Sequence, residues 1–147
     1  MSKSLLPLAL LLLPLGGAHA DDAGVNNLSA LGPMSGEQIY THICTGCHMP
    51  GATGAVGAGF YPKLASNTKF VSWEYVAITV LNGRNGMPPF GLPPAAAAQA
   101  RAIQLSDAQV AEVVNYVRSH FGNRYRGTVT ERQVAALPHP ASVAIPF

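Results

Sequence analysis

Cys44-Thr45-Gly46-Cys47-His48 is the stretch that decides the fold of this 147-residue chain. Two residues separate the cysteines, a histidine follows the second one, and the chain has no other cysteine. In an exported protein, C-x-x-C-H is typical of covalent haem attachment, with each thiol bonding one vinyl group of the haem. The sequence therefore predicts one haem c, attached through Cys44 and Cys47, with His48 as the proximal iron ligand.

Other uses of a cysteine pair have to be weighed against haem attachment. A thioredoxin-like motif belongs near a βαβ pattern, which this sequence lacks. A closed zinc site needs four ligands, and only His42, His120 and His139 are left to complete one, at irregular spacing. A structural or redox disulfide suits an oxidising compartment, so a haem-free thiol–disulfide protein stays open as an alternative.

The first twenty residues have the features of a secretory signal peptide. Lys3 gives a basic start, residues 5–15 form an apolar run, and Ala18-His19-Ala20 is a small-x-small cleavage site. The run is short for a membrane span, although an uncleaved anchor is the competing interpretation. We expect cleavage after Ala20, a periplasmic location and no membrane span in the mature protein.

Composition divides the rest of the chain into three parts. Residues 21–33 are predicted to be a flexible leader, residues 34–122 the main domain, and residues 123–147 a locally basic C-terminal extension that ends as a proline-containing strap. The formal net charge is only +2 at pH 7, without a basic patch. A nucleic-acid partner is therefore not predicted.

Helical signals occur throughout the main domain. A capping box at Ser35–Gln38 predicts a helix that leads into the cysteine motif, and a second one at Ser106–Gln109 predicts a helix to about His120. Apolar residues at helical spacing predict a helix over 73–81, ended by Gly83. Two weaker segments, 95–104 and 130–137, are also expected to be helical. No segment alternates at strand length, so we predict an all-α fold of three to five helices around the haem, which supplies the apolar centre.

Met87 is the predicted sixth ligand of the iron. Pro88-Pro89 follows it, favours an extended backbone at Met87 and stiffens the loop. A thioether ligand raises the reduction potential of a haem. Met49 directly follows His48 and cannot easily reach the opposite haem face, and Met34 lacks a rigid loop. Ordinary loop packing is the alternative interpretation of Met87.

Four aromatic residues and one arginine are further candidates near the haem. Core or haem-pocket positions are expected for Phe60, Tyr61, Trp73 and Phe90. Tyr61 and Trp73 could also donate a hydrogen bond to a haem propionate. Arg84 could pair with a propionate or could be a solvated loop charge.

With both ligand segments in place, residues 34–122 resemble the class I cytochromes c. That family has the order helix, C-x-x-C-H, proline-containing loop, helix, methionine loop and C-terminal helix. The resemblance implies that the Pro62 carbonyl accepts the N–H of the proximal histidine and that Leu64 packs on the haem. Tyr61 stands where the family usually has glycine, and residues 95–104 look inserted.

The resemblance also implies how the first and last helices of the domain meet. Gly36 and Tyr40 match the glycine and the aromatic residue of the family's N-terminal helix. Val113 and Tyr116 match the apolar and aromatic pair of its C-terminal helix. The two helices are expected to cross, with Gly36 permitting a close approach.

The loop at residues 81–90 is similar to the methionine loop of cytochrome subunits that serve periplasmic dehydrogenases. This likeness implies a one-electron carrier, not an enzyme, that accepts electrons from a dehydrogenase. It would pass them toward the respiratory chain, to another cytochrome or a terminal oxidase. A haem enzyme or gas sensor with a labile ligand at Met87 is the alternative among haem proteins, and no catalytic residue is predicted.

Overall fold

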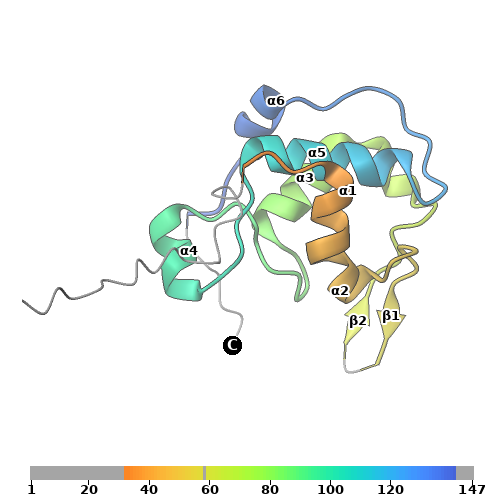
Figure 1. The fold of residues 1–147 in the computed structure, drawn as a ribbon, viewed down its shortest axis with the longest axis horizontal. Coiled ribbons are helices and arrows are strands. Elements are labelled where there is room, and N and C mark those ends of the chain that lie inside the picture. Colours follow the sequence, from red (N-terminus) through yellow and green to blue (C-terminus); the bar gives the residue numbers. More distant parts are fainter. Residues whose placement is uncertain (1–31, 58, 142–147) are drawn as a thin grey trace, which may run out of the picture.

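A computed structural model describes residues 32–57 and 59–141, and Figure 1 shows their arrangement. The predicted signal peptide and nearly all of the leader lie outside the described residues. The fold is mostly helical, with one small hairpin. Its elements are α1 (Gly36–Ile39), η2 (Tyr40–Cys44), α2 (Thr45–His48), β1 (Ala55–Val56), β2 (Phe60–Tyr61), η3 (Thr68–Val71), α3 (Trp73–Asn82), α4 (Pro94–Ala100), α5 (Asp107–Ser119) and α6 (Glu131–Ala135).

The helix that leads into the cysteine motif is confirmed. The Ser35 hydroxyl accepts the Gln38 N–H at 3.2 Å, and the Gln38 side chain accepts the Ser35 N–H at 2.9 Å. This reciprocal capping satisfies two backbone donors that a helix start leaves free. The segment continues without a break through η2, a π-helical turn, into α2. Such turns are frequent at functional sites, and this one carries Cys44.

The predicted crossing of the first and last helices is also present, between α1 and α5 (Figure 1). A Cβ atom on Gly36 would lie 2.6 Å from the Cβ of Tyr116 and would overlap the carbonyl oxygen of Glu112. Only glycine permits this approach. The Tyr40 ring packs beside the crossing, 5.7 Å from the Tyr116 ring and 4.7 Å from the Phe121 ring between centroids.

The helix α3 begins at Trp73 as predicted and runs one residue further than predicted, to Asn82. The Ser72 hydroxyl accepts the N–H of Tyr75 at 3.2 Å, and Gly83 ends the helix with a positive φ of 69°. Its apolar face is buried together with the apolar face of α5. The fully or nearly buried apolar residues of these two helices are Val76, Ala77, Leu81, Val110, Ala111, Val113, Val114 and Val117.

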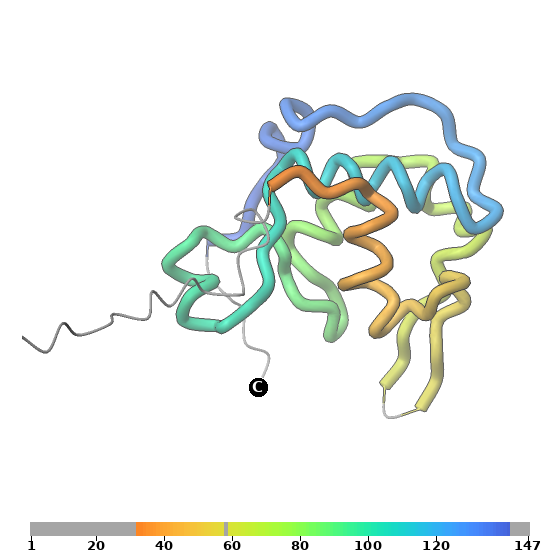
Figure 2. The backbone as a smooth tube through the Cα atoms, in the orientation of Figure 1, coloured from red at the N-terminus to blue at the C-terminus, as the bar shows by residue number. Residues whose placement is uncertain are grey.

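The hairpin of β1 and β2 was not predicted. The two strands are antiparallel, with Val56 opposite Phe60 and Ala55 opposite Tyr61. The hairpin projects from the helical body, as Figure 2 shows, and Phe60 is 74% exposed. The expectation of core or pocket positions for Phe60 and Tyr61 is therefore wrong. Strands of two residues are too short to bury a face.

The segment after Gly122 packs on the same core as the rest. In Figure 2 this tail runs back along α5 toward α6. The side chain of Asn123 is only 3% exposed, and it bonds the backbone of Leu64, Asn67 and Val117. Val129 and Val134 are buried in the main apolar cluster. Part of the predicted C-terminal extension thus contributes to the core of the domain.

The alanine-rich segment forms a shorter helix than predicted. Its helix α4 ends at Ala100, because Arg101 adopts a left-handed conformation with φ 49°. Gln104, predicted to be the end of this helix, is instead buried in the segment between α4 and α5. Among the described residues, no helix is long and apolar enough to cross a membrane.

Candidate haem site

A cavity of about 210 Å³ lies where the cysteine motif, α3, α5 and the methionine loop meet. Cys44, His48, Pro62, Leu64 and Met87 all line it. Most of its remaining wall is apolar, formed by Phe70, Val76, Val80, Val113, Val114 and Val117. The structure therefore brings five of the six predicted site residues to one apolar cavity, while Cys47 lies exposed beside it.

His48 is held in one orientation on this wall. Its ring is 7% exposed, and Nδ1 lies 3.0 Å from the carbonyl oxygen of Pro62. A carbonyl only accepts, so Nδ1 carries the proton, and in the neutral ring Nε2 is the nitrogen with the free lone pair. Nε2 makes no hydrogen bond within the described structure. Its lone pair is available for a metal ion, the usual arrangement of a histidine ligand with a carbonyl behind it.

The segment that carries Pro62 is fixed by short backbone contacts. The Gly54 N–H donates to the His48 carbonyl at 3.2 Å, and the Leu64 N–H donates to the Ala52 carbonyl at 2.9 Å. Gly54 has a φ of 68°, and a Cβ there would lie 2.7 Å from the backbone nitrogen of Lys63. These contacts return the chain to the motif and set the Pro62 carbonyl behind His48.

The two cysteines differ in environment. Cys47 is exposed, whereas Cys44 is half-buried on the cavity wall. Burial, with a smaller contribution from the charge of Cys47, raises the pKa of Cys44 to about 12. Thiol–disulfide catalysts need the opposite, a lowered thiol pKa that supplies thiolate near neutral pH. The motif is therefore poorly suited to redox catalysis by its thiols.

Met87 reaches the cavity from a tightly closed loop. Its backbone pairs with Arg84 in both directions, through N–H···O bonds of 2.9 and 3.1 Å. The next part of the loop is bonded to α3, since the Phe90 N–H donates to the Val80 carbonyl at 3.0 Å. The rival methionines, Met34 and Met49, do not line the cavity.

Two cations flank Tyr75 near the cavity. The Lys69 ammonium and the Arg84 guanidinium carbon lie 6.0 and 5.9 Å from the centre of the Tyr75 ring. Lys69 and Tyr75 line the cavity, and Arg84 Nη1 donates to the Tyr75 hydroxyl at 3.4 Å. No carboxylate of the described residues is within ion-pair distance of either cation. Trp73 packs on the core and does not line the cavity.

Sequence reasoning did not single out several cavity residues, notably Tyr40, Lys69, Tyr75 and Thr79. The spacing of Tyr75 and Thr79 carried a signal, because residues four apart share one face of a helix. Each of them directly precedes a residue of the predicted apolar stripe of α3. A slightly wider stripe on that helix would have included both. Lys69 has no comparable local pattern.

Comparison with known proteins identifies the family. Residues 32–117 match the family model described as cytochrome C oxidase, cbb3-type, subunit III. The chain belongs to the cytochrome c family. This cytochrome c domain therefore binds haem c covalently, and its helical fold confirms the predicted fold class. Membership sets aside the haem-free alternative.

Several relatives of this cytochrome c are subunits of dehydrogenases. The cytochrome c subunit of the quinone alcohol dehydrogenase of Gluconacetobacter polyoxogenes is 31% identical over 129 residues, which cover 84% of this chain and 27% of that protein. The gluconate 2-dehydrogenase cytochrome c subunit of Pantoea cypripedii is 32% identical over 108 residues, covering 71% and 24%. The fructose dehydrogenase cytochrome subunit of Gluconobacter japonicus is 35% identical over 98 residues, covering 60% and 19%. The chain thus spans about a quarter of the length of these relatives.

Proposed function

We propose that this cytochrome c is a one-electron carrier with a single haem c ligated by His48 and Met87. Cys44 and Cys47 form the two thioether bonds. The observation that carries the proposal is the shared cavity, which is lined both by the histidine with its unbonded Nε2 and by the methionine on a closed loop. The donor set of two thiols, one imidazole and one thioether fits a haem c. When bound, the haem supplies a reversible one-electron couple.

The surrounding residues restrict the site to electron transfer. The Pro62 carbonyl fixes the tautomer of His48 and increases its basicity as a ligand. The bonded loop keeps Met87 at the cavity, and the apolar walls exclude water. A site with both axial positions filled has no place for a substrate, which argues against the haem enzyme or gas sensor.

The cations beside Tyr75 give the site a basic edge. Lys69 and Arg84 lack carboxylate partners among the described residues, and a haem carries two anionic propionates. We assign these two side chains to propionate binding. An arginine there can form two parallel hydrogen bonds with a carboxylate, whereas a lysine acts as a point charge.

The relatives support a dehydrogenase as the partner of the carrier. Dehydrogenase cytochrome subunits share about a third of their matched residues with this chain. We assign the role of electron donor to a periplasmic dehydrogenase and that of acceptor to another cytochrome or a terminal oxidase of the respiratory chain. The signal peptide, cleaved after Ala20, directs the chain to the periplasm. Because Cys47 is exposed, a haem attached through it would be accessible to partners at this thioether.

Substitution of the sixth ligand tests the proposal. We expect Met87→Ala to lower the midpoint potential and to let carbon monoxide bind the reduced protein, because a thioether ligand stabilises Fe(II). Met49→Ala is the matched control, since Met49 does not line the cavity. If Met87→Ala leaves both the potential and the indifference to carbon monoxide unchanged, Met87 is not the ligand.

A further inference from the structure

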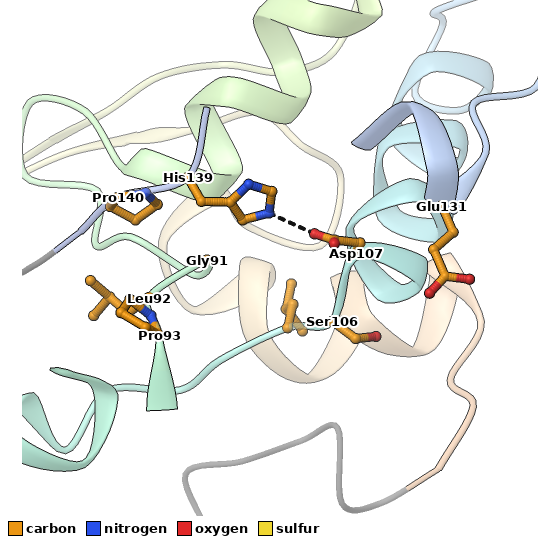
Figure 3. Close-up of a pocket in the computed structure, with 9 residues that line it drawn as sticks. Gly91, Leu92, Pro93, Ser106, Asp107, Glu131, His139 and Pro140 are labelled. Atoms are coloured by element: carbon orange, nitrogen blue, oxygen red, sulfur yellow. Dashed lines mark hydrogen bonds and ion pairs between the residues drawn. The ribbon is translucent and has the colours of Figure 1, made fainter. Parts of the chain in front are cut away.

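The segment Leu137–Pro140, here called the strap, leaves α6 and spans the ends of two other helices. The Pro138 carbonyl accepts a hydrogen bond from the Asn82 side chain at 2.9 Å, at the end of α3. One residue later, His139 Nε2 lies 2.8 Å from Asp107 Oδ1, at the start of α5. Figure 3 shows the His139 ring directed at this carboxylate across an open cleft.

The first anchor point adjoins the start of the Met87 loop, and the second lies near the segment that contacts the other end of that loop. Asn82 is the last residue of α3, and the loop starts at the next position. At its other end, Phe90 accepts the Leu105 N–H at 2.9 Å, two residues before Asp107. Leu92 nearby donates its N–H to the Gln104 side chain at 2.6 Å. The strap therefore connects the end of α3, where the loop starts, with the segment before α5 that contacts the end of the loop.

The geometry at His139 requires a proton on both ring nitrogens. Nδ1 lies 2.8 Å from the Leu137 carbonyl oxygen, and Nε2 lies 2.8 Å from the Asp107 carboxylate. Both partners are acceptors, and only the imidazolium has two N–H groups to donate. A neutral ring leaves one of these contacts without a hydrogen.

The charges around His139 favour the same form. Asp107 of α5 and Glu131 of α6 line the cleft with it, and no lysine or arginine among the described residues does. The hydrogen bond to Asp107 is the main cause of a raised His139 pKa. A raised folded-state pKa means that the stabilisation is complete below the ordinary histidine pKa and is lost as pH rises through the raised value.

We propose that His139 is a positioning residue for Met87: its protonated strap braces the end of α3, where the methionine loop starts, against the start of α5, near which the loop ends, and loss of the proton loosens that loop. The inference rests on the proposed function, in which Met87 ligates the iron. The strap would make the rate at which Met87 leaves the iron depend on pH. The histidine itself never contacts the haem site, since it does not line that cavity.

The test uses the oxidised, haem-loaded protein and added imidazole, which competes with Met87 for the iron. The rate at which imidazole replaces Met87 is followed by loss of the charge-transfer band of methionine-ligated ferric haem. At each pH this rate is divided by the concentration of neutral imidazole, the form that binds iron. We expect the rate to rise about two- to fivefold as His139 deprotonates, the size expected for one half-exposed ion pair. His139→Gln, which cannot titrate, should show the faster rate at all pH values. His120→Gln, at the far end of α5, should behave like the original protein.

A second readout does not depend on the ligand. Hydrogen exchange at the Phe90 and Gly91 amides, which bond the loop to α3, should quicken in His139→Gln at low pH. An unchanged pH profile of ligand exchange or of amide exchange in His139→Gln would overturn the strap proposal. If Met87→Ala shows that Met87 is not a ligand, the proposed function fails, and amide exchange alone still decides the role of the strap.

Discussion

Replacement of Gly36 by alanine probes the crossing of α1 and α5. The added Cβ would lie 2.6 Å from the Cβ of Tyr116 and 2.7 Å from the carbonyl carbon of Glu112. Carbon atoms in favourable contact are about 3.5–4.0 Å apart. Because the Glu112 carbonyl belongs to the backbone of α5, no rotamer change relieves the overlap. The helices must separate by roughly 1 Å.

The cost follows from two opposing terms. Overpacking of a tight contact costs about 1–3 kcal/mol. Replacing glycine by alanine in a helix recovers up to about 1 kcal/mol, and less at the first helical position, which Gly36 occupies. We expect a net loss of about 1–2 kcal/mol in the free energy of unfolding. For a domain of this size, the melting temperature should fall by roughly 4–8 °C.

Denaturant and thermal unfolding of the haem-loaded protein measure this loss. Gly46→Ala is the matched control, because Gly46 is also helical and a Cβ there meets nothing within 4 Å. The control should unfold at the same temperature as the original protein or slightly above it. A Gly36→Ala variant as stable as the control would refute the argument that the crossing requires glycine.

Three other substitutions test further contacts. Gly83→Ala should lower the free energy of unfolding by about 1–3 kcal/mol, because the φ of 69° and ψ of 170° at this position suit only glycine. It should also speed carbon monoxide binding to the reduced protein, because it displaces the Met87 loop. Asn123→Ala should lower the free energy of unfolding by about 2–4 kcal/mol in denaturant, because one buried and two part-buried backbone groups lose their partner. Val134→Ala removes two buried methyl groups and should lower the free energy of unfolding by about 2 kcal/mol in the same assay. An unchanged free energy of unfolding would mean that α6 contributes nothing to the core.

The parts of the fold that the sequence predicts well have strong local signals. The capping boxes at Ser35 and Ser106 mark helix starts through contacts three residues apart. Gly83 and Gly122, both with positive φ, mark where the chain leaves a helix. The C-x-x-C-H motif sets the cofactor chemistry within five residues.

The parts that escaped prediction depend on distant contacts. Asn123 gives no local sign that it bonds backbone groups 56 and 59 residues away. The pairing of His139 with Asp107 spans 32 residues, and its strap offers only prolines as a pattern. The strands of the hairpin are too short for any alternation to be seen, so only the apolar character of Phe60 is left to predict its position, and it wrongly favours the interior.

The central claim is that His48 and Met87 are both ligands of the haem iron, and one measurement tests it most directly. Visible spectra of the exported, purified protein should be recorded oxidised and reduced, with and without carbon monoxide. We predict a low-spin c-type spectrum, a methionine–iron charge-transfer band in the oxidised form, and no change on adding carbon monoxide to the reduced form. Rapid carbon monoxide binding by the unaltered protein would contradict the account, because it would show an open position where Met87 is expected.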